Sequence, residues 1–315
     1  MEIDQSRHHY TSEHRLKEIN EYFNEHGTSE TLQRYGIKEC TLDRYQKDLG
    51  IPKKPRHAKI LLLDIETLPL VCYAWDVWKQ NIAPVQIIKD RALICWSAKW
   101  LFSSETLSDC VTPEEALKRD DSRICGTIWQ LMEQADVIVG HNGKDFDIKV
   151  LNTRFIINGF RPPSPYQIID TLIQARSQFA FISNKLDFIG RILTNRSKLD
   201  TNFKLWIRCD NGEQKALDYM VKYNKVDITL LENAYLYLRP WMKSHPNMGI
   251  LMDASDTVCT HCGSSDIVPV EGTTYNTIVG TYVAMRCKCC GATPHARVNQ
   301  LSKEKRKVLL ASSAR

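Results

Sequence analysis

The stretch LLLDIET, residues 61–67, is an apolar run that ends in two acids separated by one residue, Asp64 and Glu66. Successive side chains of a β-strand point to opposite faces, so acids spaced two apart lie on the same face. Two carboxylates held that close repel each other unless a cation joins them, and carboxylate oxygens suit a hard divalent metal. The stretch predicts a buried strand over residues 59–64 with a metal site at its end, although many strands end in an acid.

A second buried strand is expected from ADVIVG, residues 135–140, which leads directly into HNGKDFDIKVL, residues 141–151. This pattern places Asn142 in a loop and places Phe146 and Asp147 at the start of a helix. Asp147 is the third acid that follows a predicted strand.

The fourth acid lies in the motif YNKVD, which contains Tyr223 and Asp227. Residues four apart share one face of a helix, so both side chains can project toward the same site. The four acids and one tyrosine therefore form a candidate constellation for metal-dependent chemistry.

Residues 58–246 alternate apolar runs with stretches of helical periodicity, which predicts an α/β domain whose sheet is covered by helices. Further strands are expected over residues 91–101 and 136–140. Helices are expected over residues 148–157, 186–193 and 216–238.

The ordered set DIET, N-x3-FD and Y-x3-D resembles the three motifs of the DEDDy 3′–5′ exonucleases, which have a ribonuclease H-like fold with a mixed sheet flanked by helices. Within that superfamily, GHNGKDFD (140–147), IDTLIQARSQF (169–179) and NKLDFIGRIL (184–193) are most similar to the proofreading domains of family B DNA polymerases. AWDVWKQNIAP (74–84) resembles phage-encoded relatives without a polymerase domain. The resemblance covers residues 60–239.

This resemblance implies that Asp64, Glu66, Asp147 and Asp227 hold two Mg²⁺ or Mn²⁺ ions, with Asp64 bridging them. Two ions roughly 4 Å apart can activate a water molecule and stabilise the leaving 3′ oxygen of a phosphodiester. Tyr223 is implied to orient the attacking water, and its alternative role is that of a core tyrosine.

Three further positions resemble family positions near the terminal nucleotides: Phe146 as an apolar wall, Asn142 as a hydrogen-bond donor and Thr67 beside the 3′ end. Phe146 could instead belong to the core, and Thr67 could cap a turn. Most of four tryptophans are expected to be core residues, although such rings can also stack on unpaired bases. These are Trp75, Trp78, Trp96 and Trp100.

The N-terminal segment, residues 1–57, is expected to be all-α and to end in a basic linker. A first helix should break at Gly27, and residues 29–49 should form two short helices capped by Ser29 and Thr41. This pattern resembles the helix-turn-helix of DNA-binding domains. A plain three-helix or partner-docking module is the alternative, because acids and bases are mixed on the second of these helices.

The C-terminal segment, residues 247–315, contains two CxxC-G knuckles, Cys259 with Cys262 and Cys287 with Cys290. Four thiolates predict one tetrahedral structural Zn²⁺ site, and a hairpin between the knuckles makes the module resemble a zinc ribbon. Disulfides or free thiols are the alternatives. The basic stretch KEKRK beyond them is consistent either with phosphate contact or with a solvated tail.

Composition sets wider bounds. The net charge of +5, from 42 basic and 37 acidic residues, is too small to indicate a nucleic-acid partner by itself, and 43% hydrophobic content is ample for a core. No apolar run approaches the roughly 20 residues needed to span a bilayer, and the N-terminus lacks a secretory signal. The chain is expected to be soluble, cytoplasmic and without a membrane partner, and a phage-encoded origin is suspected.

The sequence thus predicts a metal-dependent 3′–5′ exonuclease that hydrolyses DNA from a single-stranded 3′ end and releases nucleoside 5′-monophosphates. Replication or repair proteins are possible partners, and the oligomeric state is open. The alternatives are a DNA-binding regulator with a non-catalytic nuclease fold, an exoribonuclease, and an endonuclease acting on branched substrates.

Overall fold

The computed structural model describes residues 13–37, 39–49 and 57–310. The chain divides into two compact units, residues 1–56 and 57–315. Within the described residues, no helix is both long enough and apolar enough to cross a membrane.

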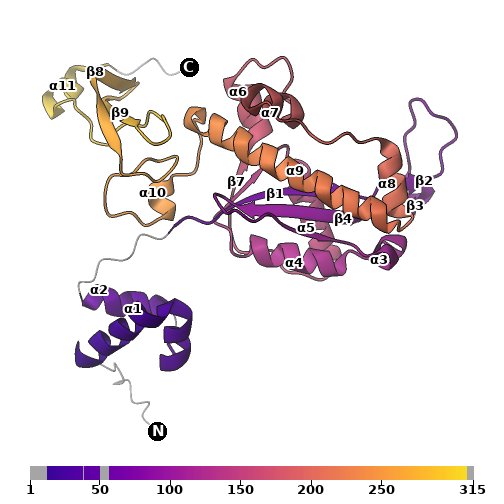
Figure 1. The fold of residues 1–315 in the computed structure, drawn as a ribbon. Helices are drawn as coiled ribbons and strands as arrows, with labels where there is room; N and C mark the ends of the chain where they lie inside the picture. Colours follow the sequence, from indigo (N-terminus) through magenta and orange to yellow (C-terminus); the bar gives the residue numbers. More distant parts are fainter. Residues whose placement is uncertain (1–12, 38, 50–56, 311–315) are drawn as a thin grey trace, which may run out of the picture. The chain divides into compact units, whose positions relative to one another are not determined.

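The described part of the first unit contains two helices, α1 (Glu13–Tyr35) and α2 (Glu39–Asp48) (Figure 1). α1 is followed directly by Gly36, whose φ of 61° lies in the left-handed region that glycine adopts without strain. The backbone N–H of Ile37 then donates to the carbonyl of Leu32 at 3.3 Å, which satisfies an unpaired carbonyl of the last turn.

Two expectations for this unit are wrong. α1 runs without interruption through Gly27 and Ser29, where a break and a new cap were predicted, and α2 starts before Thr41. A glycine inside a helix costs only about 1 kcal/mol relative to alanine, and the burial of Ile19 and Leu42 between the helices outweighs that cost. Most of the predicted basic linker lies outside the described residues.

The second unit is built around a five-stranded mixed sheet in the order β5-β4-β1-β6-β7. β5, β4 and β1 pair antiparallel, whereas β1, β6 and β7 pair parallel. The strands are β1 (Ile60–Thr67), β4 (Leu93–Trp100), β5 (Leu107–Cys110), β6 (Val137–Gly140) and β7 (Gln167–Asp170).

Helices cover both faces of this sheet, with α9 lying along one face and α4 and α5 on the other (Figure 1). The mixed α/β architecture expected from the sequence is confirmed. The helices are α3 (Pro113–Lys118), α4 (Ser122–Met132), α5 (Asp147–Ile157), α6 (Thr171–Gln178), α7 (Leu186–Thr194), α8 (Phe203–Asp210) and α9 (Gln214–Leu238).

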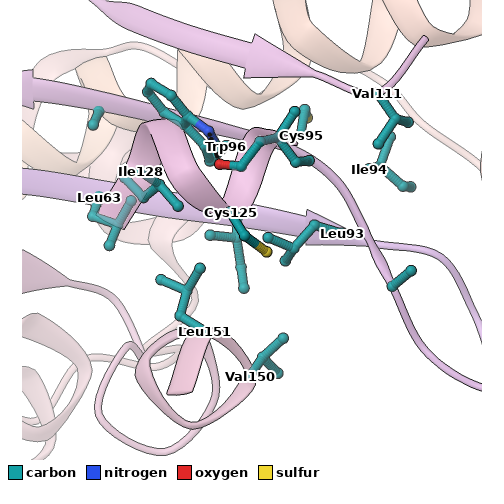
Figure 2. Packing of buried hydrophobic residues seen from close by; sticks show 14 of the residues in the cluster. Leu63, Leu93, Ile94, Cys95, Trp96, Val111, Cys125, Ile128, Val150 and Leu151 are labelled. Atoms are coloured by element: carbon teal, nitrogen blue, oxygen red, sulfur yellow. Dashed lines mark hydrogen bonds between the residues drawn. The ribbon is translucent and has the colours of Figure 1, made fainter. Parts of the chain in front are cut away.

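β1 is apolar over residues 60–63 because both faces of this part of the strand are covered. Leu61 and Leu63 pack into one hydrophobic cluster, whereas Ile60 and Leu62 pack into the other. Figure 2 shows the first cluster, in which side chains from β1, β4, α4 and α5 interlock. This packing fixes the face on which the acids at the end of β1 must lie.

The tryptophan expectation is only partly right. Trp96 is 4% exposed and belongs to the core, but Trp75 and Trp78 are 96% and 79% exposed. Both lie in the long loop between β2 (Val71–Cys72) and β3 (Ile87–Lys89), which includes a short 3₁₀ turn, η1, at Pro84–Gln86. This hairpin forms its own two-stranded sheet, so no second layer covers its tip.

Beyond α9, the chain forms an antiparallel hairpin, as the spacing of the knuckles predicts. The ring of His261, between two of the cysteines, stacks on His245 and bonds the Met242 carbonyl at 2.8 Å. His245 in turn bonds the hydroxyl of Tyr235 on α9 at 2.9 Å. The elements are η2 (Arg239–Trp241), α10 (Met248–Leu251), β8 (Ile267–Thr277), β9 (Gly280–Cys287) and α11 (Lys303–Val308).

Asp121, which is 1% exposed, joins three elements of the second unit. Its carboxylate accepts hydrogen bonds from the backbone N–H of Leu93 at 2.9 Å, from Arg154 Nε at 2.7 Å and from Asn158 Nδ2 at 2.9 Å. One side chain therefore holds the start of β4 and the end of α5 to the N-terminus of α4.

We expect Asp121→Ala to lower the free energy of unfolding by about 3–5 kcal/mol, because it leaves the partly buried Arg154 guanidinium without its carboxylate. The exposed neighbour provides a matched control, and Asp120→Ala should cost no more than about 1 kcal/mol. Urea unfolding of both variants followed by far-UV circular dichroism measures the difference. Equal losses would contradict the role assigned to Asp121.

Candidate active site

Three of the predicted acids converge where β1 ends against α9. One carboxylate oxygen each of Asp64, Glu66 and Asp227 can be chosen so that all three lie within 4.8 Å of one another. Asp64 and Glu66 share a face of β1, and Asp227 comes from the helix that covers that face. A β-bulge separates Glu66 from Thr67, and bulges commonly re-aim side chains beside functional sites.

The fourth acid, Asp147, is the first residue of α5 and lies directly beside this group. Its Oδ1 accepts the backbone N–H of Ile65 at 3.0 Å, so its position is tied to the strand between Asp64 and Glu66. The structure therefore brings all four predicted acids to one end of β1, with three in a tight cluster and the fourth held against the backbone.

The crowding changes the acid strength of these groups. Burial raises the pKa of Glu66 to about 7 and that of Asp147 to about 7. Burial, followed by repulsion from Asp147 and Asp227, raises the pKa of Asp64 well above its usual range. Burial also raises the pKa of Asp227, although Lys198 opposes the shift. Without a further cation, these carboxylates do not all ionise readily at neutral pH.

The cluster has the donor atoms that a hard divalent cation requires. Asp227 Oδ1 is buried and makes no hydrogen bond within the described residues, while its Oδ2 is paired with the Lys198 ammonium. A buried carboxylate oxygen without a partner is costly, and a metal ion would satisfy it. Asn224 Nδ2 donates to Asp64 Oδ2 at 2.6 Å and fixes the direction of that carboxylate.

Tyr223 lies one helical turn before Asp227, as the spacing predicts, and its hydroxyl faces the acids. Lys198 Nζ lies 3.5 Å from this hydroxyl and 5.3 Å from the ring centroid. The edge of Trp206 packs against the ring at 6.3 Å between centroids. Burial raises the pKa of Tyr223, so the phenol stays protonated at neutral pH.

The loop that delivers Asp147 is held by Asp170 at the end of β7. The two oxygens of this buried carboxylate accept the backbone N–H groups of Asn142 at 3.0 Å and Lys144 at 3.1 Å. Asn142 has a φ of 66°, a strained conformation for a non-glycine residue and a frequent mark of functional loops. A Cβ on Gly143 would lie 3.1 Å from the Cα of Gly140, so the loop closes tightly.

The three predicted substrate contacts lie around the acids. Thr67 ends β1, whereas Asn142 lines a cavity of about 620 Å³ together with Arg176, Lys185 and Lys198. Phe146 lines a second cavity of about 270 Å³. Their contact with a nucleotide stays a prediction.

Sequence reasoning missed Lys198, Asn224 and Asp170. Asp170 had a readable signal, because an aspartate between a strand and a helix favours an N-cap, and its Oδ1 accepts from Leu172 N at 2.9 Å. Lys198 and Asn224 carry no comparable local signal. They contact the acids only because α9 and the segment before α8 fold against β1.

A second candidate metal centre lies in the C-terminal hairpin module. The sulfur atoms of Cys259, Cys262, Cys287 and Cys290 all lie within 4.8 Å of one another, and the shortest separations are 3.6 and 3.7 Å. These distances are far beyond a disulfide bond, which is about 2.05 Å long. Cys289 is exposed and lies outside the cluster.

The two knuckles have the same backbone geometry. The N–H of Gly263 donates to the carbonyl of Cys259 and that of Gly291 to the carbonyl of Cys287, each at 2.9 Å. Both glycines have positive φ, 76° and 83°, which a side chain would disfavour. Four converging sulfurs on two tight turns fit a tetrahedral metal ion.

A family model of the RNase_H superfamily matches residues 104–239. The match includes Asp147, Tyr223 and Asp227 and begins after Asp64 and Glu66. Together with the mixed sheet and its flanking helices, it identifies a ribonuclease H-like domain in this chain.

Among solved structures, the chain is similar to the family B DNA polymerase of the hyperthermophilic archaeon Pyrobaculum calidifontis, with 14% identity and a TM-score of 0.44. The similarity covers 60% of this chain and 26% of the polymerase, so it spans about a quarter of that protein. No curated protein matches the chain.

The raised pKa values predict how metal binding depends on pH. Since Glu66 and Asp147 have pKa values of about 7, protons compete with a cation below neutrality. The apparent affinity for Mn²⁺ should therefore rise between about pH 6 and about pH 8, with proton release on binding. Isothermal titration calorimetry in buffers of different ionisation enthalpy measures both quantities.

The metal-free protein should show the reverse trend in stability. The folded state holds protons on these carboxylates more tightly than the unfolded chain. Their contribution to the free energy of unfolding is therefore lost as pH rises through about 7.

Glu66→Gln should weaken Mn²⁺ binding and flatten its pH dependence. An affinity that does not change with pH in the wild-type protein would refute the assignment.

Proposed function

We propose that this protein is a metal-dependent 3′–5′ exonuclease that hydrolyses DNA and releases nucleoside 5′-monophosphates. The observation that carries the proposal is the convergence of Asp64, Glu66 and Asp227, with Asp147 beside them and Tyr223 one turn from Asp227. This set has the four carboxylates and the tyrosine of the DEDDy type. The ribonuclease H-like domain supports a nuclease activity.

Bound Mg²⁺ or Mn²⁺ ions would supply an activated water and stabilise the leaving 3′ oxygen. Asp64, Glu66 and Asp227 would hold them, with Asp147 completing the set. Tyr223 keeps its proton, so its hydroxyl serves to orient the attacking water by hydrogen bonding and not to remove its proton.

The basic cavity next to the acids supports a nucleic-acid substrate. Its lining places Arg176, Lys185 and Lys198 near Asn142, with Asp187 as the opposing charge. Arg176 and Lys185 around a space of about 620 Å³ suit the phosphates of a single-stranded 3′ end, whereas Lys198 is already paired with Asp227. DNA is favoured over RNA on the motif resemblance and on the N-terminal helix pair, which we propose to be a DNA-binding helix-turn-helix.

This activity would serve DNA replication or repair in a cytoplasmic, phage-infected setting. A DNA-binding regulator, an exoribonuclease and a branched-substrate endonuclease are the three competing assignments, and one labelled-strand assay, run on DNA, RNA and a branched duplex, separates them from the proposed activity.

A 5′-labelled single strand incubated with Mn²⁺ should shorten in single-nucleotide steps. Asp227→Asn should slow this by roughly a hundredfold or more, because it removes a metal ligand. Asp218→Asn, an exposed carboxylate on the same helix, is the matched control and should retain the wild-type rate. Tyr223→Phe should keep Mn²⁺ binding and lose roughly a hundredfold in rate.

The alternatives give different products. Cutting of a 5′-labelled branched duplex into discrete internal fragments would identify the endonuclease. Faster shortening of an RNA strand of the same sequence would identify an exoribonuclease. Binding of the single strand and the branched duplex without cleavage of either would identify a regulator. Each of these results would overturn the proposed activity.

We further propose that the four-cysteine cluster holds one structural Zn²⁺. Its four sulfurs leave no position for water, so the ion would stabilise the module and take no part in hydrolysis.

Cys290→Ser should release the zinc and unfold the C-terminal hairpin module. Cys289→Ser changes the exposed neighbouring thiol and should retain the metal. Elemental analysis of the purified variants gives the zinc content, and limited proteolysis reports the folding of the module. A Cys290→Ser protein that keeps one zinc per chain would exclude this ligand set.

A further inference from the structure

The loop that joins β2 to β3 exposes three aromatic side chains. Tyr73, Trp75 and Trp78 are 75%, 96% and 79% exposed. Figure 1 shows this loop extending away from the sheet. Exposing large aromatic rings to water is unfavourable, so a cluster of exposed rings on one loop indicates a binding site. Residues 71–91 are called the aromatic hairpin below.

The base of the aromatic hairpin is firmly anchored although its tip is uncovered. Arg119 donates to the carbonyl of Pro69 at 2.8 Å and also to the carbonyl of Asp90, so one guanidinium holds both ends of the hairpin. The same side chain pairs with Asp210 at the end of α8 at 2.8 Å. The exposed rings therefore project from a fixed support.

The hairpin begins close to the acids and is continuous with a cavity beside them. The cavity of about 270 Å³ is lined by Leu70 and Arg91 from the base of the hairpin and by Phe146 and Lys149 from the loop and helix that deliver Asp147. The Arg91 guanidinium lies 5.6 Å from the centroid of the Phe146 ring. A strand leaving the acids along this cavity would reach the aromatic hairpin.

Two cations along this route suit the phosphates of a nucleic-acid strand. Lys79 follows Trp78 directly, and Arg91 lines the cavity, where Asp90 is the opposing charge and Lys149 is paired with Asp145 at 2.7 Å. Asp76 and the 84% exposed Val77 lie between Trp75 and Trp78, and Lys79 and Gln80 follow directly. These charged and polar groups interrupt the apolar surface beside the rings, and unpaired bases need flat rings with cations near the phosphates.

We propose that the aromatic hairpin is a binding surface for the unpaired bases of a single-stranded nucleic acid whose 3′ end lies at the four acids. Bases stack on Trp75 and Trp78, and the phosphates lie near Lys79 and Arg91. Stacking does not depend on base identity, so the surface accepts any sequence. The inference rests on the proposed function, since it names how that same site holds its substrate.

Binding of a fluorescent single-stranded oligonucleotide, measured by anisotropy with Ca²⁺ in place of Mg²⁺, tests this surface. Trp75→Leu and Trp78→Leu keep an apolar side chain and remove the flat ring. Each should weaken binding roughly 5- to 150-fold, the range found for loss of one stacked base. Trp78→Tyr, which restores a ring, should recover most of the affinity.

A matched control comes from α9, where Tyr237 is also exposed but lies outside the hairpin. Tyr237→Ala should bind the oligonucleotide like the wild-type protein. Circular dichroism checks that all variants are folded. If both leucine variants also bind like the wild-type protein, the proposal is wrong. If Trp78→Tyr binds as weakly as the leucine variants, base stacking is also refuted, and a protein-docking surface is favoured.

The length of the strand provides an independent measurement. The affinity loss in Trp75→Leu should be large for an oligonucleotide and much smaller for a dinucleotide, which cannot reach from the acids to the hairpin. Equal losses for both ligands would show that the substitution disturbs the acid site itself and would overturn the proposal.

Failure of the proposed function gives a different result. Hydrolysis of the p-nitrophenyl ester of thymidine 5′-monophosphate by the wild-type protein with Mn²⁺ reports the acids with a ligand too short for the hairpin. If the wild-type protein is inactive but the leucine variants still bind the strand more weakly, the proposed exonuclease activity is wrong and the binding surface stands. If the wild-type protein is active and the leucine variants bind normally, the activity stands and the binding surface is wrong.

Discussion

The repulsion among four carboxylates at the end of β1 is the constraint on which the rest of the structure depends. Burial raises the pKa values of all four acids, and repulsion from Asp227 and Asp147 adds to the shift at Asp64 and Glu66, so the folded chain bears a destabilising cluster that a divalent cation would relieve. Lys198 offsets only part of this charge, through Asp227. The burial of the large hydrophobic core around β1 must outweigh the unfavourable free energy of the acids that Lys198 does not offset.

The fold meets this constraint by carrying each acid on a separately fixed element. β1 is packed on both faces, so Asp64 and Glu66 cannot turn away from α9. Asp147 is held to the backbone of β1, and Asp170 fixes the loop that precedes it. The acids are therefore positioned before any metal binds, which lowers the reorganisation needed for binding.

Parts of the chain outside the sheet contact the same framework. The C-terminal cysteine module reaches α9, the helix of Tyr223 and Asp227, through the stacked rings of His261 and His245 and the hydroxyl of Tyr235. The aromatic hairpin is anchored at its base through Arg119. Both attachments join residues far apart in the sequence, and neither leaves a periodic pattern that a reader of the sequence could use.

The sequence by itself determined the α/β class, the strand that ends in Asp64 and Glu66, and the helical spacing of Tyr223 and Asp227, because these depend on periodicities of two and 3.6 residues within short stretches. Only the tertiary structure decided that Lys198 pairs with Asp227, that α1 continues through Gly27 and that Trp78 is exposed while Trp96 is buried. Burial and charge pairing depend on which distant elements pack together, and this information is absent from local spacing.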